Sequence, residues 1–261
     1  MDCSAALADT LIAMPSVSLS SLGLALGLFA SIAATPARGT VIYATGFEAP
    51  DFSLGELPGQ DGWLTTASIY SSQGVNVSTA RAASGTQSVE IDSTYFPAGD
   101  WFWKPLNYQV TPANQIIQIS VDMYLASTAL NSGGWGIDCY DDTGARVGQF
   151  YVDPHGLAYI SDGPNSQPAA LAGRDAWTHF VFTLDYGQRL MTLGVNGNAP
   201  IGSLALNSAA DSTLADADFR LFQAGTDTAY FDNLSIVAVP GTGVGSVGVG
   251  AAILLGARRR R

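Results

Sequence analysis

The sequence predicts an all-β protein built as a two-sheet antiparallel β-sandwich. Short segments with alternating apolar and polar residues recur along the middle of the chain, and turn-forming residues separate them. The middle of the chain shows no convincing helical period. A content of 29 glycines among 261 residues also favours short strands joined by tight turns. The middle part, about two hundred residues long, is large enough for one domain with a complete core.

The predicted strands have a typical strand length and one apolar face each. In chain order they are VNVSTA (75–80), SVEIDS (88–93), IIQISVDMYL (116–125), WGIDCY (135–140), VGQFYV (147–152), GLAYIS (156–161), THFVFTLDY (178–186), MTLGVNG (191–197), FRLFQA (219–224) and YFDNLSIVAV (230–239). DDTGA (141–145) and DPHG (153–156) are typical of tight turns between hairpin strands. This spacing of strands and turns predicts the antiparallel sandwich.

Composition divides the chain into three parts: residues 1–38, 39–239 and 240–261. The first part has the pattern of a secretory signal peptide, because the apolar run 20–34 precedes Thr35 and Ala37, which are small enough for a signal peptidase site. No Lys or Arg precedes that run, so a true start at Met14 is an alternative. A buried helix of the mature domain is the other alternative. The second part is the predicted β-sandwich.

The third part begins at a Val-Pro-Gly step and contains fourteen small or apolar residues, 244–257, before four terminal arginines. A helix of that length rises about 21 Å, which is less than the roughly 30 Å of a bilayer's hydrocarbon core. The arginines would stay on the cytoplasmic side. The predicted sorting residues are Val239, Pro240, Gly241, Arg258, Arg259, Arg260 and Arg261.

This tripartite tail resembles the PEP-CTERM sorting signal of exported bacterial proteins, although Val-Pro-Gly stands where that family has Pro-Glu-Pro. The resemblance implies an exosortase-type partner that cleaves the tail after transient membrane insertion of the short apolar helix. The body would then remain at the cell surface or outside the cell. A plain C-terminal membrane anchor is the alternative.

Three stretches of the body resemble the concanavalin A-like lectin and glucanase superfamily, including its LamG-like members. They are ASGTQSVEI (83–91), AWTHFVFTLDYGQRLMTLGVNG (176–197) and YFDNLSI (230–236). Carbohydrate-binding jelly rolls of the galactose-binding-like type share the opening GFE (46–48) and the closing FDN (231–233), and they are the alternative superfamily. Either resemblance implies a jelly-roll sandwich.

Glu48 and Asp232 are the candidate metal ligands. In a jelly roll the first and last strands commonly lie side by side, which could bring these two carboxylates together. Oxygen ligands of this kind suit calcium, and related carbohydrate-binding modules bind a structural calcium ion at matching positions. The alternative is that Asp232 caps a turn through Asn233 and that Glu48 is solvated.

The candidate ligand-binding residues are Trp101, Trp103 and Trp135, because saccharide binding needs aromatic faces beside a few polar groups. For each of them the alternative is packing in the core. Trp177, at the start of its strand, is expected in the core, as is Cys139.

The charge inventory excludes several functions. Residues 39–257 carry 20 acidic against 6 basic side chains, a net charge of −14, so nucleic acid is not expected as a partner and an anionic polysaccharide would need calcium to bridge it. His155 and His179 lack ligands at zinc spacing. Glu90 and Asp92 form a carboxylate pair on one strand, but the further downstream carboxylate of the glucanases is missing.

The sequence therefore predicts an exported β-sandwich protein of the cell surface or extracellular matrix, which binds carbohydrate without catalysis. A structural surface protein with no specific ligand is the alternative. A glycoside hydrolase or polysaccharide lyase is the third possibility, and it would need convergent carboxylates or basic residues in a cleft.

Overall fold

The computed structural model describes residues 39–65, 74–92, 101–126, 134–200, 202–221 and 228–241. The predicted signal segment 1–38 and the tail from residue 242 onward, with both predicted terminal helices, lie outside these residues. No helix in the described part of the chain is long and apolar enough to cross a membrane.

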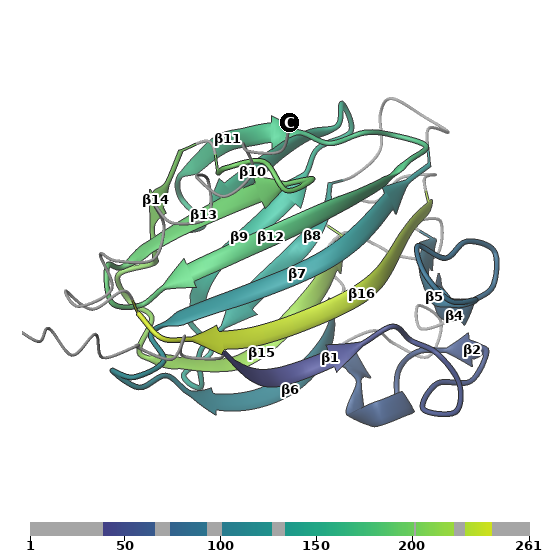
Figure 1. Ribbon diagram of the computed structural model, residues 1–261, viewed down its shortest axis with the longest axis horizontal. Helices are drawn as coiled ribbons and strands as arrows, with labels where there is room; N and C mark the ends of the chain where they lie inside the picture. The colour runs from purple at the N-terminus through teal and green to yellow at the C-terminus, as the bar shows by residue number, and fades with distance from the viewer. Residues whose placement is uncertain are drawn as a thin grey trace, which may run out of the picture. The chain divides into compact units, whose positions relative to one another are not determined.

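The described chain forms two antiparallel sheets packed face to face, which confirms the predicted all-β sandwich (Figure 1). Sheet A has the strand order β14-β13-β12-β7-β16-β5-β4-β2, and β1 also pairs with β16. Its strands are β1 Thr40–Thr45, β2 Gly55–Glu56, β4 Val75–Ser78, β5 Ser88–Asp92, β7 Ile116–Leu125, β12 Trp177–Asp185, β13 Leu190–Val195, β14 Leu204–Ala205 and β16 Thr228–Val239.

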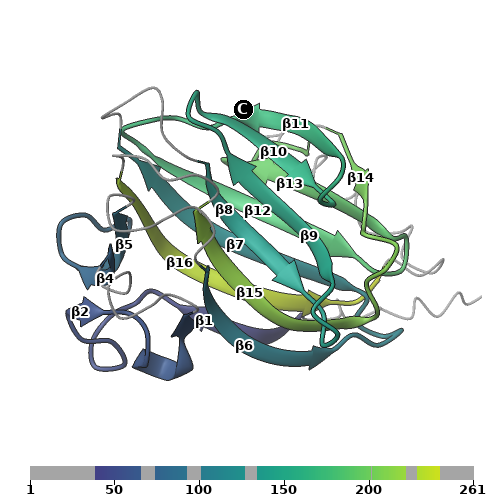
Figure 2. The ribbon, with the colours of Figure 1, turned by 180° about the vertical axis from the view of Figure 1, so that it is seen from behind.

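Sheet B has the strand order β11-β10-β9-β8-β15-β6-β3. Its strands are β3 Leu64–Thr65, β6 Trp101–Gln109, β8 Trp135–Tyr140, β9 Arg146–Val152, β10 Leu157–Ser161, β11 Ser166–Leu171 and β15 Thr213–Leu221. A short 3-10 helix, η1 Gln60–Gly62, precedes β3. Figure 2 shows β9, β8, β15 and β6 as the layer that faces the viewer when the molecule is seen from behind.

All ten predicted strands correspond to strands of the structure, because the alternation of apolar residues fixes which face of a strand is buried. Both predicted turns are present. Asp141 N–H donates to Ala145 O between β8 and β9, and Asp153 N–H donates to Leu157 O between β9 and β10. The alternation pattern did not indicate the short strands β2, β3 and β14, nor β1 and β11, and it left 101–105 as strand or loop.

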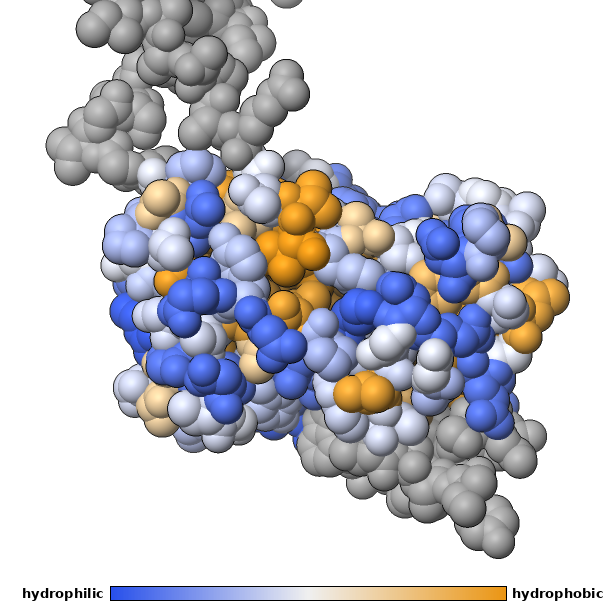
Figure 3. All heavy atoms as spheres, turned by 90° about the horizontal axis from the view of Figure 1, so that it is seen from below, coloured by the Kyte–Doolittle hydropathy of each residue, from blue (hydrophilic) through white to orange (hydrophobic). Residues whose placement is uncertain are grey.

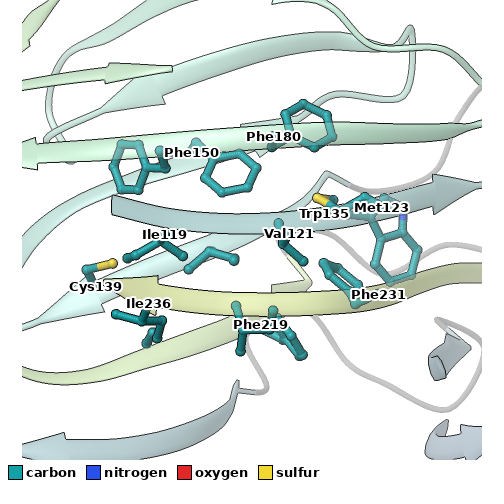
Figure 4. Packing of buried hydrophobic residues seen from close by; sticks show 14 of the residues in the cluster. Ile119, Val121, Met123, Trp135, Cys139, Phe150, Phe180, Phe219, Phe231 and Ile236 are labelled. Atoms are coloured by element: carbon teal, nitrogen blue, oxygen red, sulfur yellow. The ribbon is translucent and has the colours of Figure 1, made fainter. Parts of the chain in front are cut away.

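The core lies between the two sheets and is rich in aromatic rings (Figure 4). Phe219 of sheet B stacks on Phe231 of sheet A with ring centroids 4.5 Å apart, and Trp63 stacks on Phe219 at 4.9 Å. Phe150 of sheet B stacks on Phe180 of sheet A at 5.3 Å. Such offset ring pairs add to the burial energy of each ring, so the aromatic contacts hold the two sheets together.

The described surface in Figure 3 is largely hydrophilic, with hydrophobic patches between polar side chains. Large apolar side chains that are exposed in the described part of the chain are Val41, Leu54, Leu64 and Leu171. Scattered apolar residues of this kind are normal on a protein surface. They do not by themselves indicate a binding site.

Candidate functional site

The outer face of sheet B carries a cluster of charged side chains at the centre of the sheet. On β8, Ile137 and Cys139 belong to the core, so the side chain of Asp138 between them points to the opposite face. On β15, Ala217 and Phe219 belong to the core, which leaves Asp216, Asp218 and Arg220 on the outer face. With their neighbours on the same face they form the sheet B cluster: Asp138, Tyr140, Arg146, Gln149, Asp216, Asp218 and Arg220.

Strand pairing brings the members of the sheet B cluster together. Asp218 of β15 lies directly opposite Asp138 of β8, and Asp138 lies opposite Gln149 of β9. Directly opposed residues have Cβ atoms about 5 Å apart. Like charges in that position repel, so the pairing of Asp138 with Asp218 needs either a counter-charge or a proton.

Two guanidinium groups supply the counter-charge for Asp138, whose side chain is fully buried. Its Oδ2 lies 2.7 Å from Arg220 Nη1 and 3.3 Å from Arg146 Nη2. The Tyr140 hydroxyl donates to the same oxygen at 3.1 Å. A buried carboxylate is stable only when it is paired and hydrogen-bonded in this way.

Asp218 is protonated, which removes the repulsion between its carboxyl group and Asp138. Burial, and next the Asp216 and Asp138 charges, raise the pKa of Asp218 to about 9, so its carboxyl is protonated near neutral pH. Burial is also the main reason why the pKa of Asp216 rises to about 6. The two side chains share a hydrogen bond, in which the Asp218 carboxyl donates to the Asp216 carboxylate.

Several polar atoms of the cluster are buried without any hydrogen-bond partner in the described structure. The acceptors among them are Asp138 Oδ1, Gln149 Oε1, Asp216 Oδ1 and Asp218 Oδ1. Gln149 and Asp218 are each only 6% exposed. A buried acceptor without a donor costs about 1–3 kcal/mol, so the two that lie outside the Asp216–Asp218 hydrogen bond, Asp138 Oδ1 and Gln149 Oε1, indicate a site for a molecule that brings hydrogen-bond donors.

Aromatic rings border the cluster on both sides. Trp103 of β6 lies directly opposite Asp218 and is partly exposed. On the other side, Tyr151 of β9 and Tyr159 of β10 stack with centroids 5.1 Å apart and ring planes 14° apart, and both are partly exposed. Polar groups between aromatic faces are the usual composition of a site for a small polar ligand.

The structure shows which of the tryptophans considered from the sequence lie on the surface and which lie in the core. Trp103 lies beside the sheet B cluster, whereas the side chain of Trp101 lies outside the described residues. The prediction for Trp135 is wrong, because it is 1% exposed within the core and has no free ring face. The prediction that Trp177 is a core residue is also wrong: Thr178 and Phe180 face the interior, so Trp177 lies partly exposed on the outer face of sheet A.

The predicted neighbourhood of Glu48 and Asp232 centres on the loop 83–87. β1 and β16 pair as expected. Glu48 Oε1 accepts hydrogen bonds from the backbone N–H groups of Thr86 and Gln87 at 2.7 and 2.8 Å, and its Oε2 accepts from the Thr86 hydroxyl. Asp232 Oδ2 accepts from the N–H groups of Ala83 and Ser84 at 2.8 and 3.0 Å.

The hydrogen bonds lower the pKa of both carboxyl groups, but the net shifts run in opposite directions. Partial burial raises the pKa of Glu48, but the hydrogen bonds from Gln87 and Thr86 outweigh burial, and the net shift is downward. Burial raises the pKa of Asp232, and the hydrogen bonds from Ser84 and its neighbours offset only part of that rise. A Cβ added at Gly85, whose φ is +63°, would overlap the Glu48 carboxylate, so only glycine suits this loop.

The fit of this pair to calcium can be judged from its donors. Both oxygens of Glu48 and both oxygens of Asp232 already accept hydrogen bonds, with Asp232 Oδ1 accepting from Asn233 N–H at 2.7 Å. Within the residues that the structure describes, no group of three or more His, Cys, Asp or Glu side chains is placed to hold a metal ion. The geometry shown therefore suits an anchored loop better than a calcium shell.

The remaining side chains considered from the sequence do not belong to the sheet B cluster. His179 Nδ1 is 2.7 Å from Asp122 Oδ1 across β12 and β7, which confirms it as a cross-strand surface partner. Glu90 of β5 faces outward from sheet A beside Tyr230. Cys139 is fully buried, and burial raises its pKa well above the usual value.

Of the predicted sorting residues, Val239 ends β16, and Pro240 and Gly241 follow it without regular structure. The four terminal arginines lie outside the described residues.

Sequence reasoning missed the sheet B cluster, although one signal was present. WGIDCY places one charged residue, Asp138, between apolar ones, and LADADFR places three at alternate positions. That pattern also fits an ordinary solvent-facing strand. Only the pairing of β8 with β15 shows that their carboxylates meet.

No family model matches the chain, and no curated protein does. Solved structures share its fold. The carbohydrate esterase vb_24B_21 from Shiga toxin-encoding bacteriophage phi24B matches with a TM-score of 0.57 and 12% identity, over 77% of this chain and 100% of that chain. Cellulose induced protein Cip1 matches with a TM-score of 0.52 and 17% identity, over 74% and 96%.

A sialidase matches with a TM-score of 0.50 and 13% identity over 67% of this chain, which spans 17% of that chain's length. At these identities the likenesses show a shared β-sandwich fold and nothing more specific.

Proposed function

We propose that this protein binds a saccharide on the outer face of sheet B. The observation that carries the proposal is a pair of buried acceptor oxygens without partners, Asp138 Oδ1 and Gln149 Oε1, on a face bordered by Trp103 and by the stacked Tyr151 and Tyr159. A saccharide offers many hydroxyl donors, and its ring faces stack on aromatic side chains. The names of the structural neighbours, a carbohydrate esterase, a cellulose induced protein and a sialidase, are compatible with such a ligand.

The binding is proposed to be non-catalytic. Glycoside hydrolysis uses two carboxyl groups about 5–10 Å apart, with the scissile bond between them. Asp216 and Asp218 are hydrogen-bonded to one another, which places them closer than that, and Asp138 is held by two arginines. An assay for new reducing ends on a panel of polysaccharides tests this, because release of sugar would contradict the proposal.

The location is proposed from the two ends of the chain. Export by the N-terminal segment and sorting by an exosortase-type partner at Val239–Gly241 and the terminal arginines would place the body at the cell surface or in the extracellular matrix, after transient membrane insertion of the tail. Mass spectrometry of the exported protein tests this, since a C-terminus at Arg261 would contradict cleavage. Calcium at Glu48 and Asp232 stays a prediction.

A glycan-array screen of the full chain tests the proposed binding face. Trp103→Ala and Gln149→Leu should each abolish or weaken any signal about tenfold or more, because they remove a stacking surface and a central acceptor. Trp177→Ala is the matched control, since it removes a partly exposed tryptophan from the outer face of sheet A. Binding lost only in the control would move the site to sheet A, and silence of the array would favour a structural surface protein.

A further inference from the structure

The sheet B cluster contains one carboxyl group more than it has cations. Its three aspartates are Asp138, Asp216 and Asp218, and its two cations are Arg146 and Arg220. Both guanidinium groups contact the same oxygen, Asp138 Oδ2. The Asp216–Asp218 pair holds one proton between its two carboxyl groups, and the charge of Arg220 also acts on Asp218.

Most of the buried polar atoms of this cluster that lack a hydrogen-bond partner are acceptors. Asp216 Oδ1 and Asp218 Oδ1 are buried and have no donor apart from the proton that the two carboxyl groups share. Gln149 Oε1, two strands from Asp218 on the same face, is buried without any donor. Gln149 is neutral and 6% exposed, so its bare oxygen is evidence for a ligand that does not depend on the acidic residues. A ligand that fits must bring several donors, and an anionic group would add further acceptors where acceptors are already in excess.

A positively charged amino group meets these requirements at the Asp216–Asp218 pair. An ammonium has three donors and no acceptor, and its positive charge can replace that of the proton which the pair holds. Trp103 lies directly opposite Asp218, and an indole ring attracts a cation placed over its face. The groups that face Asp218 are Asp138 from β8, Trp103 from β6, and Asp216 and Arg220 from its own strand.

We infer that the saccharide bound on this face is an amino sugar with a free amine, and that its ammonium binds between Asp216 and Asp218 beside Trp103. This inference rests on the proposed saccharide binding at the same site. When the ammonium binds, the proton that the two carboxyl groups hold between them leaves to solvent, and both carboxylates then accept hydrogen bonds from the amine. Charge and protons balance, since one cation replaces one proton.

The experiment compares three hexasaccharides with the same β-1,4 linkage that differ only at carbon 2: glucosamine, N-acetylglucosamine and glucose. Titration calorimetry of the full chain at about pH 7, where the pair holds about one proton, should give an affinity for the glucosamine hexamer at least about tenfold higher than for the other two. Repeating the titration in buffers of different ionisation enthalpy should show release of about one proton per bound ammonium. The preference should weaken as salt is added, because an ion pair is screened.

Substitutions distinguish binding of the amine at Asp216 and Asp218 from a general electrostatic attraction between an acidic protein and a cationic oligomer. Asp216→Asn and Asp218→Asn should remove the preference for the amine and the proton release, whereas Asp51→Asn, at an exposed turn position, should keep both. A preference that survives in Asp216→Asn and Asp218→Asn would overturn the inference. Equal affinity for all three oligomers would overturn it and leave saccharide binding intact, while no binding by any oligomer would contradict both.

Discussion

Asparagine in place of Asp218 is expected to stabilise the protein near neutral pH. The pKa of this carboxyl is about 9 in the folded protein, against about 3.9 for aspartate in an unfolded chain. Between these two values the folded state holds one proton more than the unfolded state, so stability falls as pH rises, by about 1.4 kcal/mol per pH unit. At about pH 7 the accumulated cost is about 4 kcal/mol.

Asp218→Asn removes this cost, because an amide does not ionise and can still donate a hydrogen bond to Asp216. We expect a gain of about 2–4 kcal/mol in the free energy of unfolding near pH 7, and a smaller gain near pH 5. The same substitution at Asp138, which lies opposite Asp218, should instead lower the free energy of unfolding. Asp138→Asn leaves Arg146 and Arg220 without their carboxylate and should cost about 3–5 kcal/mol.

The assay is urea denaturation of the wild-type chain and both variants at several pH values between about 5 and 9. The difference between wild type and Asp218→Asn should widen as pH rises and level off near the folded pKa of Asp218. If both proteins show the same pH dependence, or if Asp218→Asn is the less stable, Asp218 does not hold a proton in the folded state.

Three further predictions concern the rest of the fold. Glu48→Gln should loosen the loop 83–87, which hydrogen exchange would show as faster amide exchange at Thr86 and Gln87. Because the folded pKa of Glu48 is lowered, the wild-type loop should lose the same protection as pH falls through that pKa. Unchanged exchange would contradict the anchoring role of Glu48. Phe219→Ala should cost about 3–5 kcal/mol in a urea melt, since it removes the ring stacked against Phe231 of the other sheet, and a cost below about 1 kcal/mol would contradict that packing. If calcium binds at Glu48 and Asp232, a chelator should lower the melting temperature and added calcium should raise it in a dose-dependent way. A melting temperature that changes with neither would refute calcium binding there.

The sequence by itself determined the fold class, because burial of one strand face requires a period of two along each strand, and that period is visible without any contact. It also determined the hairpin turns at Asp141 and Asp153, where the residues that permit a tight turn are local to the turn. The approach of Glu48 and Asp232 to one neighbourhood followed from the expected pairing of the first and last strands.

Only the tertiary structure decided which alternating charges meet. Asp138 and Asp218 are 80 residues apart in sequence order and become neighbours because β8 pairs with β15 in one particular register. A shift of one residue would send either side chain to the other face. The same dependence on strand phase put Trp135 in the core and Trp177 on the surface, the reverse of what their sequence surroundings suggested. Strand alternation is a local property of the chain, whereas register between distant strands is set by the packing of the whole core, and the candidate site exists only through that register.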